Sequence, residues 1–264
     1  MFVDSHCHLV FPELAGRIDA IRADMAAAKV DRAMVICTTL EEFDAVLALA
    51  TRFDNFWATV GVHPDNEGVT EPDLATLCQL AAHPRVLAIG ETGLDYFRLN
   101  GRSVGDMEWQ RERYRVHIRA SLASAKPLVI HTRSASADTL AILAEEQGAQ
   151  AGGVFHCFTE TAEVARAALD LGFYISFSGI LTFRSAQDLR DVARFVPLER
   201  CLIETDSPYL APMPYRGKTN SPAYVPHVAA KLAEVKGLTV EAIAQATSAN
   251  FERLFRPSPA VSAP

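Results

Sequence analysis

Six residues of this chain have the side chains and the placement expected of ligands to divalent metal ions. Each follows, directly or within a few residues, a short apolar run of the kind that forms a buried strand. Imidazole nitrogens mixed with carboxylate oxygens suit Zn, Mn, Co, Ni or Fe, whereas an oxygen-rich set favours Mg or Ca, so the sequence leaves the metal open. The six residues are His6, His8, Glu91, His131, His156 and Asp206.

The spacing within the motifs adds to this indication. Side chains alternate along a strand, so His6 and His8 point to one side while Cys7 points to the other, toward the helices. For the same reason, His131 shares a face with Arg133 in HTR, and Glu204 shares a face with Asp206 in ETD. Each pair is therefore expected to face the mouth of the fold.

Each motif also has a plainer interpretation when it is taken alone. An isolated HxH is common at exposed strand ends, and a single buried histidine is more often a hydrogen-bonded core residue. Glu91 or Asp206 alone would most often cap a helix or form a salt bridge. Four imidazoles and two carboxylates at the ends of five strands would, however, be costly to remove from water without a cation. Their joint placement favours a metal site.

The segments that must position these residues alternate between strand and helix. The strands are nearly all apolar, as in a parallel sheet covered by helices, and barrel enzymes assemble their active sites at the carboxyl ends of such strands. We predict an α/β fold, a single-domain (β/α)8 TIM barrel over residues 1–256, with a disordered tail at 257–264. The predicted strands are 2–5, 33–37, 57–60, 86–89, 128–130, 153–155, 173–177 and 201–203, and the predicted helices include 18–28, 43–52, 108–125, 137–146, 162–171 and 186–196.

Composition limits the classes of function. The length of 264 residues suits one α/β barrel. The chain has 25 Lys and Arg against 32 Asp and Glu, and a net charge of −7 argues against a protein that coats nucleic acid by bulk electrostatics. No apolar run is long enough for a bilayer, the N-terminus lacks a signal-peptide pattern, and the five cysteines form no CxxC. We expect a cytoplasmic monomer with no membrane association.

Eight long motifs stand in order along the chain. They are DSHCHL at 4–9, GVHP at 61–64, GETGLDY at 90–96, KPLVIHTR at 126–133, FHCF at 155–158, SFSGILTF at 176–183, ETDSPYLAP at 204–212 and YRGKTNSPAYV at 215–225. In these motifs the sequence resembles the TatD-type metal-dependent deoxyribonucleases of the amidohydrolase-like barrel superfamily, from residue 1 to about residue 256. The resemblance implies one ion on His6, His8 and Asp206, a second on His131 and His156, and Glu91 bridging both.

The resemblance also implies an activity. Members of this family are regarded as Mg- or Mn-supported nucleases, some acting from the 3′ end of single strands, and some relatives remove misplaced acyl groups from tRNA. The leading hypothesis is a deoxyribonuclease with two divalent ions per chain (Mg, Mn or Zn) that hydrolyses DNA from single-stranded 3′ ends. The alternative is a two-metal hydrolase of a carboxylic ester or amide, such as an aminoacyl-tRNA deacylase or a small-molecule amidohydrolase, because the fold alone does not decide the substrate. A metal-binding scaffold without activity is a third hypothesis.

A two-metal mechanism gives roles to several residues. Ions about 3.5 to 4 Å apart can activate a shared water and hold the attacking and leaving oxygens. Glu91 would fix their spacing, and Asp206 would orient the water and accept its proton. His63 is expected near the leaving group or scissile phosphate, with a turn histidine before Pro64 as the alternative. Asp95 is expected to orient a ligand imidazole or a water, or else to cap a loop.

Basic residues near these motifs are candidates for holding phosphates. Arg133 offers a two-pronged guanidinium, and Glu204 is its expected ion-pair partner. Arg216 and Lys218 lie in a loop after the last predicted ligand, where they would hold a flanking phosphate or form a solvated basic turn. The residues available to stack a base are Tyr209 and Tyr215.

Two other groups are expected to be structural. Asn220, Ser221 and Pro222 have the types that begin a helix. Asn250 and Arg253 are expected to anchor the last helix to the barrel.

Overall fold

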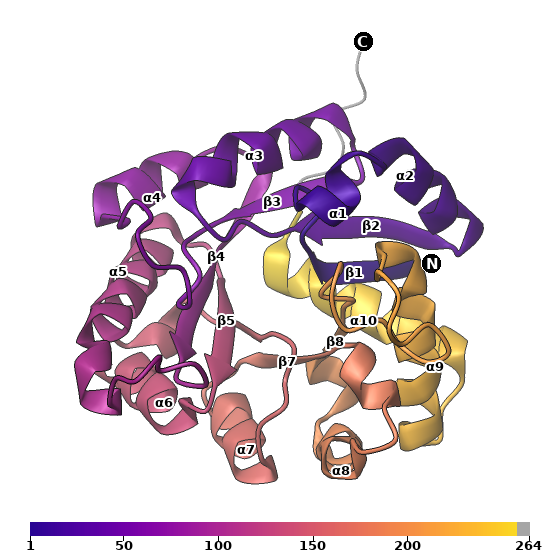
Figure 1. Cartoon of the computed structure of the whole chain (residues 1–264). Helices are drawn as coiled ribbons and strands as arrows, with labels where there is room; N and C mark the ends of the chain where they lie inside the picture. The colour runs from indigo at the N-terminus through magenta and orange to yellow at the C-terminus, as the bar shows by residue number, and fades with distance from the viewer. Residues whose placement is uncertain (258–264) are drawn as a thin grey trace.

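The apolar runs form eight parallel strands, each paired with the next along the chain, in the computed structural model, which describes residues 1–257 (Figure 1). The tail predicted at 257–264 lies, apart from its first residue, outside the described residues. The strands are β1 (Phe2–Cys7), β2 (Val30–Val35), β3 (Phe56–Val60), β4 (Val86–Asp95), β5 (Leu128–Arg133), β6 (Gly153–Phe155), β7 (Tyr174–Phe177) and β8 (Cys201–Ile203).

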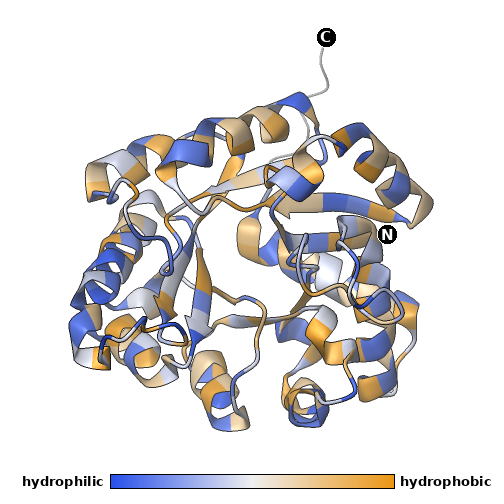
Figure 2. Cartoon of the chain, in the orientation of Figure 1, coloured by the Kyte–Doolittle hydropathy of each residue, from blue (hydrophilic) through white to orange (hydrophobic). Residues whose placement is uncertain are grey.

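Helices follow the strands and cover the outside of the sheet. Their residues alternate between hydrophobic and hydrophilic around each helix (Figure 2), as expected for helices with one buried face. No helix within residues 1–257 is both long and apolar enough to cross a membrane. The α-helices are α1 (Pro12–Ala15), α2 (Ile18–Ala27), α3 (Phe43–Arg52), α4 (Leu74–Ala81), α5 (Glu108–Ser124), α6 (Ser136–Glu145), α7 (Ala162–Asp170), α8 (Gln187–Phe195), α9 (Val225–Lys236) and α10 (Val240–Phe255).

The first and last strands meet, which brings the two ends of the sheet together. Cys7 forms a parallel bridge with Ser207, just beyond β8. The backbone N–H of Asp206 donates to the carbonyl of His6 (3.0 Å), and that of His8 donates to the carbonyl of Ser207 (2.8 Å). These bonds set three predicted ligands beside one another at the carboxyl ends of the strands.

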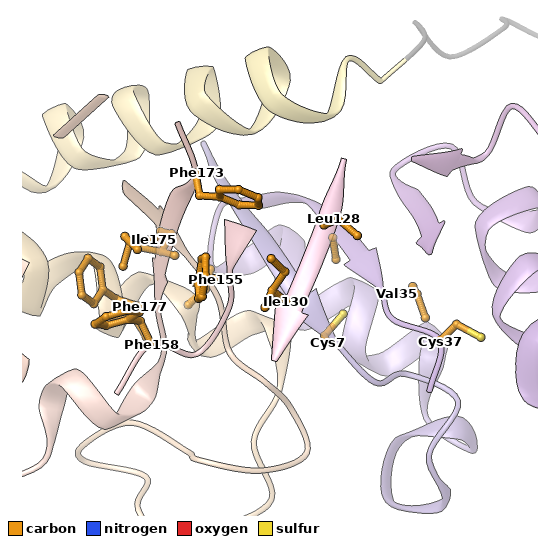
Figure 3. Packing of buried hydrophobic residues seen from close by; sticks show 14 of the residues in the cluster. Cys7, Val35, Cys37, Leu128, Ile130, Phe155, Phe158, Phe173, Ile175 and Phe177 are labelled. Atoms are coloured by element: carbon orange, nitrogen blue, oxygen red, sulfur yellow. The ribbon is translucent and has the colours of Figure 1, made fainter. Parts of the chain in front are cut away.

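Two layers of buried side chains line the two faces of the sheet. Phe155, Phe173 and Phe177 belong to the larger cluster (Figure 3), which also contains buried residues of the covering helices. A second cluster contains Val129 and Val154 and is joined by aromatic residues of α10. Because side chains alternate along a strand, residues two positions further along β5 and just beyond β6 share the face of this second cluster. Those residues are His131 and His156.

The observed elements confirm the predicted (β/α)8 barrel, with differences at the boundaries. The strand predicted to end at residue 89 continues to Asp95, so Glu91 lies within β4 and not after it. β1 and β5 likewise extend through His6 and His131. The expected anchor of the last helix is confirmed for Asn250, whose side-chain amide donates to the carbonyls of Leu198 and Cys201, each at 2.8 Å. Arg253 instead donates to Oδ1 of Asn250 on the same helix (2.9 Å).

Candidate metal centre

The carboxylate of Glu91, with its side chain 3% exposed, lies at the centre of the cluster of predicted ligands. On one side, its Oε2 lies 3.3 Å from Nε2 of His6 and 3.9 Å from Nε2 of His8. Oδ1 of Asp206 lies 3.2 Å from Nε2 of His8 and 3.5 Å from Nε2 of His6. One ligand atom each from His6, His8 and Glu91 lies within 4.8 Å of the others, close enough to hold a single ion.

The second oxygen of Glu91 faces three other imidazoles. Its Oε1 lies 2.8 Å from Nε2 of His156, 3.2 Å from Nδ1 of His131 and 3.3 Å from Nε2 of His63. The structure thus brings all six predicted ligands together and adds His63, which sequence reasoning placed nearer the leaving group. Glu91 turns one oxygen toward each of two groups of imidazoles, and the rings of His6 and His156, one from each group, stack with centroids 3.9 Å apart.

Two further carboxylates each contact a ligand imidazole at the ring nitrogen that does not face Glu91. Oδ2 of Asp95 lies 3.1 Å from Nε2 of His131, and Oε1 of Glu204 lies 3.2 Å from Nδ1 of His156. In both cases the other ring nitrogen faces Glu91. Carboxylates in this position fix the tautomer and the direction of a metal-binding imidazole. The expected pair of Glu204 with Arg133 does not form within residues 1–257, because Glu204 is fully buried against His156 while Arg133 is exposed at the end of β5.

The loop after β8 holds Asp206 by a network of buried polar groups. Asp206 has a left-handed backbone (φ 57°), so it faces the cluster from a turn and not by strand alternation. The Asn220 amide donates to the carbonyls of Thr205 (2.8 Å) and Tyr209 (2.6 Å), on either side of Asp206. Oδ1 of Asp4 accepts from the N–H of Thr205 (2.9 Å). Asn220 therefore braces this loop. The expected helix start is confirmed directly after it, where Ser221 caps the short 3-10 helix Pro222–Tyr224 that leads into α9.

The donor set fits divalent cations. Five imidazoles surround one buried carboxylate, and no Lys or Arg within residues 1–257 forms an ion pair with Glu91. Buried charges of this kind are normally paired or coordinate metals. Mixed nitrogen and oxygen donors of this kind are common ligands of divalent metal ions.

Comparison with known proteins agrees with this geometry. Residues 3–256 match the sequence profile of the family described as TatD related DNase. This chain belongs to that family. The TatD-family resemblance of the sequence is thereby confirmed over nearly the whole chain.

Several relatives in the TatD family match end to end. The chain is 49% identical to the uncharacterized metal-dependent hydrolase YcfH of Escherichia coli K12, over 96% of this chain and 95% of the relative. It is 36% identical to the 3′-5′ ssDNA/RNA exonuclease TatD of Cronobacter turicensis, over 90% and 91%. The crystal structure of YJJV, a TatD homolog from E. coli K12, superposes with a TM-score of 0.89 at 30% identity, covering 97% of this chain and 98% of that one.

Charges within this TatD-family cluster are strongly coupled. Burial alone would raise the pKa of Glu91, but His156, His63 and His6 hold that pKa well below its usual range. Burial would lower the pKa of His156, but Glu91 and Glu204 raise it well above its usual value. Burial lowers the pKa of His6 and of His63. Since imidazoles bind metal only when neutral, protons and cations compete for these nitrogens.

The basic residues predicted to hold phosphates each lie over an aromatic ring. Their cationic groups are 3.6 Å (Arg133 on Phe97), 4.3 Å (Arg216 on Phe183) and 5.9 Å (Lys218 on Tyr215) from the ring centroids. All three side chains are exposed. Such contacts hold a cation in place while leaving its edge free for other ligands.

Two polar residues of α5 behind His63 were missed by sequence reasoning. The N–H of Val62 donates to Nε2 of His117 (2.9 Å), whose Nδ1 contacts the carbonyl of Arg113 (2.8 Å). The Arg113 guanidinium donates to the carbonyls of His63 and Asn66, each at 2.8 Å. Their four-residue spacing on one helix face was the available signal. Burial lowers the pKa of His117 to about 4, so its imidazole is neutral and accepts from Val62.

Proposed function

We propose that this chain is a divalent-metal-dependent hydrolase that removes nucleotides from the 3′ ends of single-stranded DNA. The observation that carries the proposal is the buried Glu91, which turns one oxygen toward each of two histidine groups. This is the arrangement that a two-metal phosphodiesterase needs. The name of the Cronobacter relative, a 3′-5′ ssDNA/RNA exonuclease, supports the choice of substrate.

Six residues would hold the ions. Two divalent ions at this place would lower the pKa of a water toward neutrality and stabilise the attacking and leaving oxygens of a phosphodiester. Glu91 would fix their separation. We assign one ion to His6, His8 and Asp206 and the other to His131 and His156, with Glu91 shared.

Asp206 is the proposed proton acceptor. Burial would raise the pKa of its carboxyl, but a hydrogen bond to His8 and the nearby His6 lower that pKa, so the carboxylate is ionised at neutral pH. Its side chain is 15% exposed, more than that of Glu91, and reaches the edge of the cluster where a water can approach. A carboxylate so placed can orient the attacking water and take its proton.

His63 is the proposed hydrogen-bond donor to the substrate. Its Nδ1 accepts from the backbone N–H of Asp65 (3.0 Å), so the neutral ring carries its proton on Nε2. That Nε2 faces Oε1 of Glu91 at 3.3 Å, beside the second group of imidazoles. An N–H at this position can bind a phosphate oxygen or the leaving oxygen.

The test is cleavage of a 5′-labelled single-stranded oligonucleotide with added Mg or Mn, beside the Asp206→Asn variant. We expect a metal-dependent ladder that shortens from the 3′ end, and a loss of about a hundredfold or more in the variant, because a positioned acid or base contributes about 10² to 10⁴. Thermal unfolding of the variant checks that it folds. Full activity in Asp206→Asn would refute the role of Asp206. No cleavage by a wild-type protein that binds two ions would refute the nuclease and turn attention to esters and amides.

A further inference from the structure

Two exposed aromatic rings stand at the mouth of the barrel, one beside each histidine group. Phe97 follows β4 and is 56% exposed, and Tyr209 follows β8 and is 51% exposed. Single exposed hydrophobic side chains are common on protein surfaces, so it is the position of these two rings, and not their exposure alone, that singles them out. Both lie in loops at the carboxyl ends of strands, on the same side of the barrel as Glu91.

Phe97 is linked through Asp95 to His131, one of the imidazoles that face Oε1 of Glu91. The N–H of Phe97 donates to Oδ1 of Asp95 (2.8 Å), whose Oδ2 lies 3.1 Å from the ring of His131. The guanidinium of Arg133 lies over the Phe97 ring, 3.6 Å from its centroid. Arg133 forms no ion pair within residues 1–257, so its charge is available beside the ring.

Tyr209 is linked to Asp206 and His8, which lie near Oε2 of Glu91. The N–H of Tyr209 donates to the carbonyl of Asp206 (3.0 Å). Its ring forms a T-shaped contact with Phe11, with centroids 6.2 Å apart and planes 68° apart. Phe11 in turn stacks on His8, with centroids 4.6 Å apart and planes 16° from parallel. A continuous aromatic path thus leads from a predicted ligand to the rim.

We propose that Phe97 and Tyr209 are stacking platforms for the two bases that flank the scissile phosphodiester of a single-stranded DNA end. The proposal rests on the proposed function and specifies how that substrate is held. Aromatic rings bind single strands without regard to sequence, since every base has a flat face. Arg133 beside Phe97 supplies the charge that a flanking phosphate requires.

The structure distinguishes between the two tyrosines that the sequence offered as platforms. The ring of Tyr215 is stacked on Tyr224, with centroids 4.1 Å apart and planes 4° from parallel, and Lys218 lies near it at 5.9 Å. One face of the Tyr215 ring is therefore covered by Tyr224. Tyr209 makes a single T-shaped contact with Phe11 and its side chain stays 51% exposed.

A matched pair of variants tests the platform. Phe195 on α8 is also exposed, at 38%, and also carries an arginine over its ring, Arg166 at 4.5 Å, but it lies on an outer helix. Phe97→Ala and Phe195→Ala are compared in the Asp206→Asn background, so that turnover does not consume the oligonucleotide. The measurement is the Kd of a fluorescent oligothymidylate at fixed salt. A parallel oligonucleotide carries abasic residues at its last two positions.

We expect Phe97→Ala to raise the Kd of oligothymidylate about fivefold to a hundredfold, the usual effect of losing one base–aromatic stack, while Phe195→Ala stays within about twofold. The abasic oligonucleotide should bind Phe97→Ala and its parent equally. Equal Kd values for the two alanine variants, or an equal loss with the abasic oligonucleotide, would overturn the proposal for Phe97.

Tyr209→Ala provides the same test for the second ring, with the same expected range and the same abasic control. The binding readout also separates this inference from the nuclease proposal. Cleavage by the wild type with no effect of Phe97→Ala on Kd refutes the platform alone. A selective effect on Kd without cleavage by the wild type would show that Phe97 stacks a base but would refute the nuclease, and with it a scissile bond between the two bases.

Discussion

The buried His117 predicts how the stability of this protein depends on pH. The folded protein keeps its imidazole neutral, with the pKa lowered from 6.5 to about 4 by burial. The unfolded chain binds a proton below pH 6.5, so acid favours the unfolded state. The stabilising contribution is therefore complete above pH 6.5 and is lost as the pH falls toward 4. From these two pKa values, the loss is about 2 kcal/mol between pH 7 and pH 5, and about 3 kcal/mol at pH 4.

The perturbation that isolates this effect is His117→Gln, which keeps a neutral acceptor near the N–H of Val62 and removes the titration. Urea unfolding is followed by circular dichroism at pH 7 and pH 5, with a chelator so that metal binding does not contribute. The other histidines are common to both proteins and cancel in the comparison. The free energy of unfolding of the wild type should fall by about 2 kcal/mol more than that of the variant. The same fall in both proteins would refute the reasoning.

His117→Leu serves as a second variant. It removes the acceptor as well as the titration, so the buried N–H of Val62 loses its partner. The variant should be less stable than the wild type at pH 7 by about 1 to 3 kcal/mol, yet show the shallow pH dependence of His117→Gln. A steep pH dependence in His117→Leu would show that another group carries the effect.

Two further predictions concern residues that support the cluster. Asp95→Asn should weaken metal binding about tenfold to a hundredfold by isothermal titration, because it removes the carboxylate that orients His131; unchanged affinity would count against this role. Asn220→Ala should lower the free energy of unfolding by about 2 kcal/mol, since the carbonyls of Thr205 and Tyr209 lose their donor; a loss below about 0.5 kcal/mol in urea unfolding would contradict the proposed brace.

The order of strands and helices could be predicted because the periodicity of apolar residues is a local property of the sequence. Apolar runs predict the central residues of the strands. The amphipathic segments between them predict the helices, and for α3 they predict both ends to within a residue. The predicted ligands also gathered as expected, because parallel strands of a barrel all end at one face. Strand ends were less certain, since β4 continues to Asp95 through residues such as Gly93 that have little strand propensity. A Cβ at Gly93 would overlap the carbonyl of His131, so close packing of β4 and β5 explains that residue.

The parts that could not be predicted depend on contacts between distant segments. Asp206 reaches the cluster through a left-handed turn, which no alternation rule describes. Glu204 pairs with His156 and not with Arg133, because Glu204 and His156 are buried inside the barrel whereas Arg133 lies exposed at its rim. The supporting role of His117 depends on the packing of α5 against the loop after β3, which is a tertiary contact between segments distant in the sequence.

The backbone bonds between the start of the chain and the loop after β8 have a consequence for synthesis. His6 leaves the ribosome early, whereas Asp206 emerges only after all eight strands have been made. On the proposed ligand assignment, a nascent chain that has not yet reached Asp206 has three of the four ligands of the first ion, His6, His8 and Glu91, and lacks only the last. The ion would then have its full set of ligands only after all the strands are made. Metal uptake would therefore report the completion of folding.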